Sequence, residues 1–364
     1  MISFKLTEEQ EVVREAMHEF AEQVLRPAAR DCDEASQVSP ELLDQTWELG
    51  LVSTAIPEAF GGGGEARSPV TNAILAEELA WGDAALATAA LAPAAFAFAI
   101  VDQGSDAQRE ELLPLFCGER FHAASLAWVE PGALFDPLAL QTKAEPKGSG
   151  FVLSGAKSFV PFGDRASHFL VVARNNGSHD AFVVPRDAAG LGISETEKNL
   201  GLRALPTSTL ELERVELPAS ARLGGEAGSD VPRLLGHSRA GLAALMTGLS
   251  RAVVDYAVPY AKERRAFDQA IAQKQGIAFK ISEMHIETEC MRWLTWKAAS
   301  QLEQGVDALQ FAHHARAYAA KQCMFVADEG VQVLGGHGFI REHPVEMWYR
   351  NARTLGVLEG TLGL

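Results

Sequence analysis

The sequence predicts an α+β protein in which a small β-sheet domain lies between two helical domains. Apolar residues recur at helical spacing through residues 1–120 and again, over longer stretches, through 231–364. Between them, residues 121–230 contain short β-rich runs bounded by Gly, Asn and Pro turns. The strands do not alternate with helices and no G-x-G-x-x-G turn is present, which argues against a Rossmann fold. We therefore expect three domains with these boundaries.

The first domain has a clear start. Residues 7–10, Thr-Glu-Glu-Gln, have the spacing of a capping box, and apolar residues at helical spacing follow. A second helix is expected from Pro40 to Leu51, and the glycine run 61–64 is expected to be a flexible loop because no Gly-Lys-Ser/Thr follows it. Residues 84–101 carry no charge, as a membrane span would, but their alanine content and Pro93 favour a buried helix.

The middle domain is expected to form a small sheet or barrel. Leu210 and Leu212 alternate with polar residues in the way that a half-buried antiparallel strand requires. Turns such as Asn176-Gly177 separate the strands. The expected strands cover residues 151–155, 169–173, 181–185 and 209–215.

The last domain is expected to be an antiparallel bundle of long helices. Residues 237–264, a stripe from Ile277 to Leu294, and residues 311–334 have few breaks and short connections. Faces this apolar on so few helices also predict burial against another subunit. We therefore expect a homo- or hetero-oligomer, either a dimer or a tetramer.

Composition narrows the possible partners and the compartment. The net charge of −16 argues against nucleic-acid binding, which needs clustered Lys and Arg. The four cysteines form no C-x-x-C pair and the N-terminus does not resemble a signal peptide, so we expect a cytoplasmic protein outside the membrane. His285, Glu289 and His313-His314 do not have the spacing of a ligand set, and no metal is predicted.

The most distinctive stretch is residues 332–361. It contains a Gly335-Gly336 break, a Pro-Val-Glu run that enters a short helix with Arg350 and Arg353, and a terminal Glu359-Gly360-Thr361. Glu359 has apolar residues before it and a glycine after it, so we expect little polar company for its carboxylate, and a partly desolvated Glu is a better base. Taken alone, a Glu-Gly pair is more often a helix end, here capped by Gly360, than a catalytic base.

The whole stretch resembles the C-terminal signature of the acyl-CoA dehydrogenase family. In that family a Q-x-x-G-G-x-G-[FY] break, a P-V-E run, an Arg-Asp-Ala run and a terminal E-G-T follow in this order, and the chain matches all of them with Asn351 in place of the Asp. The resemblance implies FAD as cofactor and Glu359 as the catalytic base. Ser238, where some members of the family carry the base, cannot serve that role.

The resemblance also implies roles for other residues. Arg264 would bind the FAD pyrophosphate, for which a permanently charged guanidinium is suited. The alternative interpretation of Arg264 is that it belongs to a solvated, charged helix end and binds no ligand. Arg239 would lie near the CoA moiety and Gly360 near the substrate. The remaining cofactor residues would be Phe267, Gln275, Gln332, Gly335, Gly336 and Thr361.

The middle domain departs from the family pattern. The usual flavin loop has a Thr and a Ser where this chain has Val129 and Phe135, so two hydroxyls are absent. In the second loop Phe159 can still stack on the isoalloxazine ring. Pro161, however, replaces a hydroxyl residue that faces flavin N5, and proline offers no amide instead. Each lost hydrogen bond costs about 0.5 to 1.5 kcal/mol of FAD binding.

The implied reaction is α,β-dehydrogenation of an acyl-CoA to a trans-2-enoyl-CoA. Glu359 would remove the α-proton, flavin N5 would accept the hydride, and an electron-transfer flavoprotein would collect the electrons. The alternative is a flavin-poor, catalytically silent partner subunit of a heteromeric acyl-CoA dehydrogenase. Retention of Glu359 favours the first reading, whereas Val129, Phe135 and Pro161 favour the second.

Overall fold

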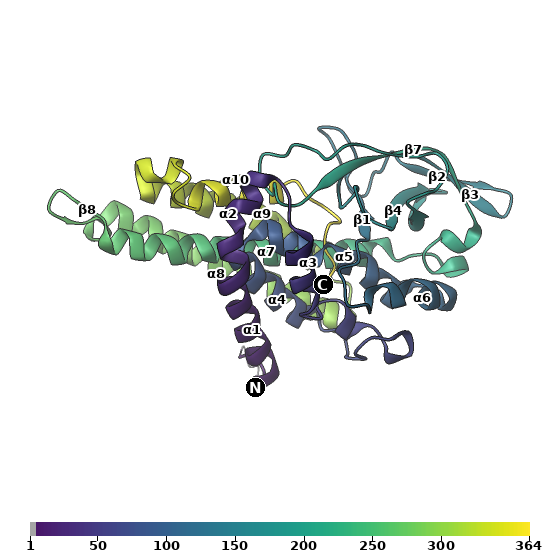
Figure 1. The fold of residues 1–364 in the computed structure, drawn as a ribbon, viewed down its shortest axis with the longest axis horizontal. Coiled ribbons are helices and arrows are strands. Elements are labelled where there is room, and N and C mark those ends of the chain that lie inside the picture. Colours follow the sequence, from purple (N-terminus) through teal and green to yellow (C-terminus); the bar gives the residue numbers. More distant parts are fainter. Residues whose placement is uncertain (1–4) are drawn as a thin grey trace.

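A computed structural model describes residues 5–364 as helices flanking one sheet (Figure 1). The α+β class expected from the sequence is confirmed. The helices before the sheet are α1 (Glu8–Phe20), α2 (Arg26–Ala35), α3 (Pro40–Trp47), α4 (Pro69–Gly82), α5 (Ala84–Gln103) and α6 (Asp106–Leu112). Those after it are α7 (Val231–Glu263), α8 (Gln275–Glu303), α9 (Leu309–Leu334) and α10 (Val345–Leu355).

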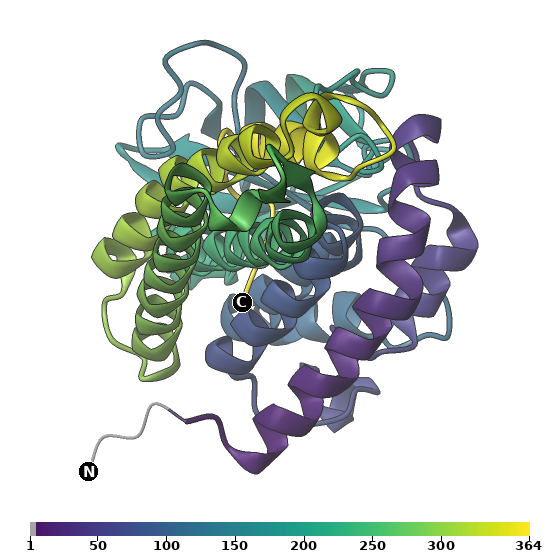
Figure 2. The ribbon, with the colours of Figure 1, turned by 90° about the vertical axis from the view of Figure 1, so that its left-hand side faces the viewer.

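The first helix begins as expected at a capping box. The Thr7 hydroxyl accepts from the amide of Gln10, and the Gln10 side chain accepts from the amide of Thr7. A single π-turn at Ala21–Leu25 joins α1 to α2 without a break. The two helices therefore form one long rod along the side of the bundle (Figure 2).

Two helix boundaries differ from expectation by four residues or more. The helix from Pro40 ends at Trp47 and not at Leu51, because the chain turns through Gly50 at a positive φ of 70°. The helix expected from residue 237 begins earlier, at Val231, where the Asp230 side chain accepts from the amide of Arg233.

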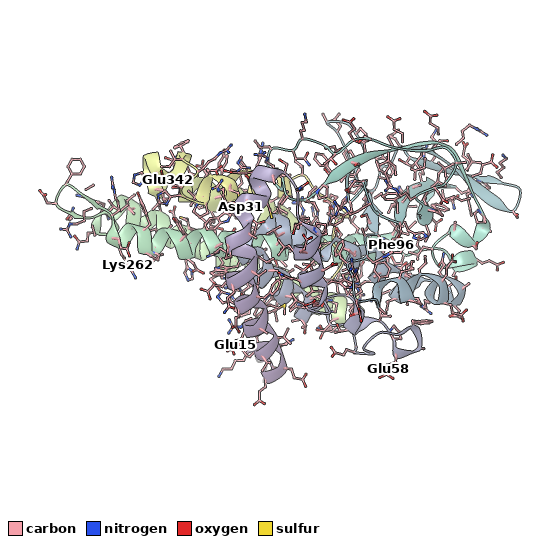
Figure 3. The ribbon with its side chains drawn as sticks, in the orientation of Figure 1. Glu15, Asp31, Glu58, Phe96, Lys262 and Glu342 are labelled. Carbon is pink, nitrogen blue, oxygen red and sulfur yellow. The ribbon has the colours of Figure 1, made fainter. Side chains whose placement is uncertain are left out.

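The uncharged segment is a core helix. Helix α5 is long and apolar enough to span a membrane, yet 94% of its apolar window is buried inside the protein. It lies beneath the sheet, where the labelled Phe96 is enclosed (Figure 3). The expected buried helix is therefore present, and Pro93 lies within it.

The sheet has seven strands in the order β1-β4-β2-β3-β7-β6, with β5 paired to β4. Leu210 and Leu212 of β7 are buried and Glu211 between them is exposed, as the alternation predicted. Most pairs are antiparallel, but β1 and β2 pair with β4 in parallel. The strands are β1 (Ser125–Ala127), β2 (Lys143–Lys147), β3 (Gly150–Pro161), β4 (His168–Asn175), β5 (Ser178–Pro185), β6 (Leu191–Ile193) and β7 (Thr207–Leu217).

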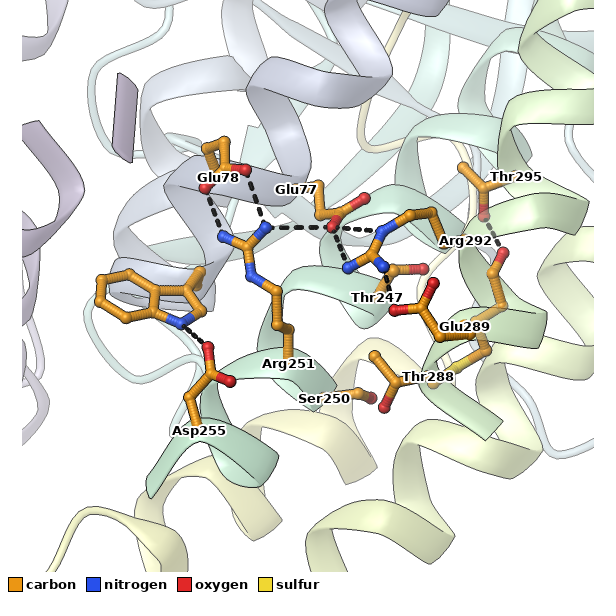
Figure 4. A network of polar contacts seen from close by, with 12 residues as sticks. Glu77, Glu78, Thr247, Ser250, Arg251, Asp255, Thr288, Glu289, Arg292 and Thr295 are labelled. Carbon is orange, nitrogen blue, oxygen red and sulfur yellow. Dashed lines mark hydrogen bonds and ion pairs between the residues drawn. The ribbon is translucent and has the colours of Figure 1, made fainter. Parts of the chain in front are cut away.

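Buried ion pairs join α4 to α7 and α8 (Figure 4). Arg251 of α7 donates to Glu77 at 3.2 Å and to Glu78 at 2.7 Å, and Arg292 of α8 donates to Glu77 at 2.7 Å. Burial alone would raise the pKa of Glu78, but hydrogen bonds from Arg251 and His18 hold it below its ordinary value. This network fixes the N-terminal helices against the bundle that carries the site.

Candidate active site

Glu359 lies in the turn after α10, directly beside Arg239 of α7. The Nε of Arg239 donates to the two carboxylate oxygens of Glu359 at 3.3 and 3.4 Å. Only 14% of the Glu359 side chain and 11% of the Arg239 side chain are exposed. The expectation that Glu359 has little polar company is therefore wrong, because long-range packing brings a guanidinium against it. Arg239, expected near CoA, has Glu359 as its ion-pair partner in this chain.

Arg316 of α9 fixes the turn that leads to Glu359. Its Nη2 donates to the main-chain oxygens of Leu355, Gly356 and Leu358 at 3.3, 3.1 and 2.8 Å. Burial lowers the pKa of Arg316 below its ordinary value, although Glu359 nearby raises it. Arg316 was not among the residues expected at the site. The one feature of the sequence that could have indicated it is an arginine within an alanine-rich helix.

Gly360 joins the turn to the sheet. Its φ is +67°, and a β-carbon there would lie 2.3 Å from Cβ of Trp128, so the backbone can approach Trp128 only at a glycine. The Thr361 hydroxyl donates to the main-chain oxygen of Glu359 at 3.4 Å. The structure thus brings the Glu359–Thr361 segment together with Arg239 and with Trp128, the residue before Val129.

A buried ion pair supports the loop that carries Val129. Lys157 is fully buried and its Nζ donates to Glu130 and to the main-chain oxygen of Trp128, both at 3.0 Å. Burial lowers the pKa of Lys157 to about 8, although Glu130 opposes the shift. The amide of Ser158 donates to the Val129 oxygen at 2.8 Å. The two expected flavin loops are therefore held together.

The second of these loops has an unusual backbone. Phe159 has a φ of +54°, which is strained for an aromatic residue. The hydroxyls of Thr207 and Thr209 donate to Glu197 at 2.7 and 2.8 Å, and the amide of Phe159 approaches the same carboxylate at 3.5 Å. Pro161 is buried and accepts from Ser125 through its main-chain oxygen. The sequence did not indicate Glu197, because it lies in the irregular segment between β6 and β7, which has no periodic pattern.

Three expected cofactor residues lie at the other end of the bundle. Arg264 ends α7, and Phe267 is at the tip of the hairpin formed by β8 (Arg265–Ala266) and β9 (Gln269–Ala270). Phe267 is 91% exposed, Gln275 is exposed, and no described residue pairs with the Arg264 guanidinium. This hairpin projects from the far end of the molecule, near the labelled Lys262 (Figures 1 and 3).

The glycine break lies at the same end. The hydroxyl of Tyr260, one turn before the end of α7, donates to the main-chain oxygen of Leu334 at 3.3 Å. Gln332, Gly335 and Gly336 are exposed, and nothing lies within 4 Å of a β-carbon built on either glycine. One chain therefore carries two separate groups of predicted residues, one around Glu359 and one on the projecting end. Among residues 5–364, no three His, Cys, Asp or Glu side chains are grouped to hold a metal ion.

Comparisons with protein families match three consecutive segments of the chain. Residues 7–120 match the acyl-CoA dehydrogenase N-terminal domain, residues 125–215 the middle domain and residues 230–363 the C-terminal domain. Together these matches cover almost the whole chain.

Individual proteins resemble the chain over the same length. The short-chain-specific acyl-CoA dehydrogenase of Clostridium acetobutylicum is 31% identical over 371 residues, 99% of this chain and 96% of the relative. Butyryl-CoA dehydrogenase of Megasphaera elsdenii is 29% identical with a TM-score of 0.89, covering 99% of this chain and 96% of that one. A glutaryl-CoA dehydrogenase of Mycobacterium smegmatis in complex with FADH2 shares the fold, at 24% identity and a TM-score of 0.87 over 98% and 92% of the two chains.

Proposed function

Because this chain belongs to the acyl-CoA dehydrogenase family, we propose that it oxidises the Cα–Cβ bond of an acyl-CoA to give a trans-2-enoyl-CoA. The chain is an oxidoreductase by family. The observation that carries the proposal is the placement of Glu359, enclosed beside Arg239 and next to the loop of Val129. A carboxylate held in that way can take a proton from a substrate carbon.

The roles of the chain's own residues follow from this geometry. Glu359 accepts the α-proton, and the guanidinium of Arg239, which donates to its carboxylate at 3.3 Å, fixes the position of that carboxylate. Arg316 and Gly360 keep the carboxylate in place from the two sides of the turn. FAD, when bound, would supply the acceptor for the β-hydrogen as hydride, and we propose an electron-transfer flavoprotein as the partner that would collect the electrons.

The residues at the projecting end fit the pyrophosphate of FAD. Arg264 offers a guanidinium without a partner among residues 5–364, and Gly335 and Gly336 leave their backbone open to a ligand. This group lies at the projecting end of the bundle, away from the C-terminal end that follows Glu359 by five residues (Figure 1), so we assign it to the FAD of a neighbouring subunit. Gln332, Phe267 and Gln275 belong to the same half-site, and the exposed aromatic ring of Phe267 is covered by that neighbour.

The test begins with the visible spectrum of the protein purified alone. Close to one FAD per chain, with bleaching by acyl-CoA under anaerobic conditions, is the expected result. The matched variant Glu359→Gln keeps the shape and hydrogen bonding of the side chain, so it is expected to hold FAD but not to bleach. Bleaching at an unchanged rate in Glu359→Gln would overturn the assignment of the base.

The second candidate is a catalytically silent partner subunit of a heteromeric acyl-CoA dehydrogenase. It is favoured by Val129, Phe135 and Pro161, which bring no side-chain hydroxyl to the flavin loops, while the Arg264 end is intact. A colourless protein that does not take up added FAD, but raises FAD binding when mixed with a paralogous chain, would support this candidate. Arg264→Ala is the control. It removes only the half-site that this chain would contribute to the FAD of the paralogous chain, so it should abolish the increase in FAD binding.

A further inference from the structure

The residues after Thr361 turn back into the interior behind Glu359. Leu362 and Leu364 are each only 1% exposed. A β-carbon on Gly241 of α7 would lie 3.2 Å from Cβ of Leu362 and 3.5 Å from Cδ2 of Leu364. A β-carbon on Gly363 would lie 3.0 Å from Cα of Ala95 in α5. The segment 362–364 is therefore wedged between α5 and α7, the helix that carries Arg239.

A polar clamp holds this segment in addition to its packing. Arg67, before α4, donates to the main-chain oxygen of Leu364 and to the Asp102 carboxylate. Its guanidinium also lies 5.1 Å from the centre of the Phe98 ring. Only 9% of the Arg67 side chain is exposed, so these bonds form away from bulk water. The leucines are fixed by interactions with three separate parts of the chain.

Little free space remains around the segment. The cavity beside it has a volume of about 10 Å³, which is room for about one water molecule. Its lining includes Leu91 and Phe98 of α5 together with Leu362 and Leu364. This cavity can therefore hold a methylene chain only if one of the two leucines is displaced.

We propose that Leu362 and Leu364 close the acyl site, so that the preferred substrates are thioesters of short acyl groups. This inference rests on the proposed function, which places the substrate α-carbon against the Glu359 carboxylate. The carrier is large and polar and must point towards solvent, so the acyl carbons point inwards. Leu362 follows Glu359 by three residues, which places it within about 10 Å along the chain. These leucines are therefore the first buried apolar side chains of the segment that follows the base.

Binding measurements test the proposal without relying on turnover. Calorimetric titration of FAD-reconstituted Glu359→Gln with butanoyl-, hexanoyl-, octanoyl- and dodecanoyl-CoA is the experiment. In an open apolar channel each added methylene raises affinity about three- to fourfold. We expect that gain to stop at or before hexanoyl-CoA and affinity then to fall. A gain that continues to dodecanoyl-CoA would overturn the proposal.

Two variants connect the limit to the leucines. Leu364→Ala removes most of a side chain, and Leu362→Val makes a smaller change that preserves folding if the larger one does not. Each is expected to raise the affinity ratio of octanoyl- to butanoyl-CoA, by about tenfold for Leu364→Ala. Leu302→Ala on α8 is the matched control, since it creates a similar cavity at a buried position that does not line the cavity beside the segment. An unchanged ratio in both test variants would contradict the inference.

The failures of the two proposals give different results. A length profile as expected in a protein that never bleaches would leave the inference standing and remove the proposed oxidation. Bleaching by all four thioesters, with an equal gain in affinity for each added methylene, would leave the proposed oxidation standing and overturn the inference.

Discussion

The guanidinium of Arg239 and the carboxylate of Glu359 face each other at 3.3 Å, although 120 positions separate them in the chain. Arg239 belongs to the buried helix α7, and Glu359 belongs to a turn that Arg316 holds by three main-chain oxygens. The pair thus joins the longest helix of the bundle to the segment that carries the proposed base. Its position explains how the carboxylate can be largely enclosed and still be partnered.

Substitution of Arg239 is expected to slow the reaction more than it weakens FAD binding. Arg239→Gln leaves Glu359 enclosed without its cation, a loss of about 1.5 to 3 kcal/mol for a charged hydrogen bond, or roughly ten- to a hundredfold in rate. Stopped-flow bleaching of the flavin at saturating acyl-CoA measures this. FAD content is the control, and a bleaching rate within a factor of two of the original would contradict the role of Arg239.

Gly360 is expected to tolerate no side chain. In Gly360→Ala the new β-carbon meets Trp128, and the φ of +67° is unfavourable for alanine, so we expect a loss of about 1 to 3 kcal/mol of stability and displacement of Glu359. Urea denaturation and bleaching together measure the two effects. Gly276→Ala, in helix α8 with nothing within 4 Å, is the matched control and should be neutral or stabilising. Equal behaviour of the two variants would refute the prediction.

The half-site at the projecting end predicts a loss of cofactor without a loss of fold. Arg264→Ala is expected to lower FAD affinity about tenfold or more, because a charged contact to phosphate disappears. Its unfolding midpoint without FAD should not change, since the side chain is exposed and unpaired in the described chain. Lys262→Ala, two residues away and also exposed, is the control. FAD retention by Arg264→Ala equal to that of the control would show that the half-site is not used.

The local parts of this fold could be predicted from the sequence, whereas contacts between distant segments could not. The capping box at Thr7 depends on neighbours three residues apart, and it was found. Strand β1 has only three residues, Ser125–Ala127, and forms by pairing with β4, so no local pattern indicated it. Arg316 and Glu197 act through partners far along the chain or in irregular loops. For the same reason the pairing of Arg239 with Glu359 was not foreseen.

The ion-pair network between α4, α7 and α8 is expected to carry a large share of the stability. Arg251→Met leaves Glu78, whose side chain is 2% exposed, with His18 alone, and breaking such a pair costs about 3 to 5 kcal/mol. Arg341→Met breaks an exposed pair with Glu34 and should cost at most about 1 kcal/mol. Urea denaturation of both variants measures the two losses of stability. Equal unfolding midpoints would contradict the large contribution expected of the buried network.

The buried Lys157 predicts a stability that rises with pH. Its pKa is about 8 in the folded chain against an ordinary 10.5, so between these values the unfolded chain binds more protons and the free energy of unfolding increases with pH. The lysine costs stability below pH 8, and the cost is removed as pH rises towards 10.5, giving a gain of about 3 kcal/mol. The double variant Lys157→Met/Glu130→Gln removes both charges and with them the pH-dependent gain. Urea unfolding of both proteins across this range measures the difference, because other titrating groups contribute equally to the two. Parallel curves would show that Lys157 titrates normally.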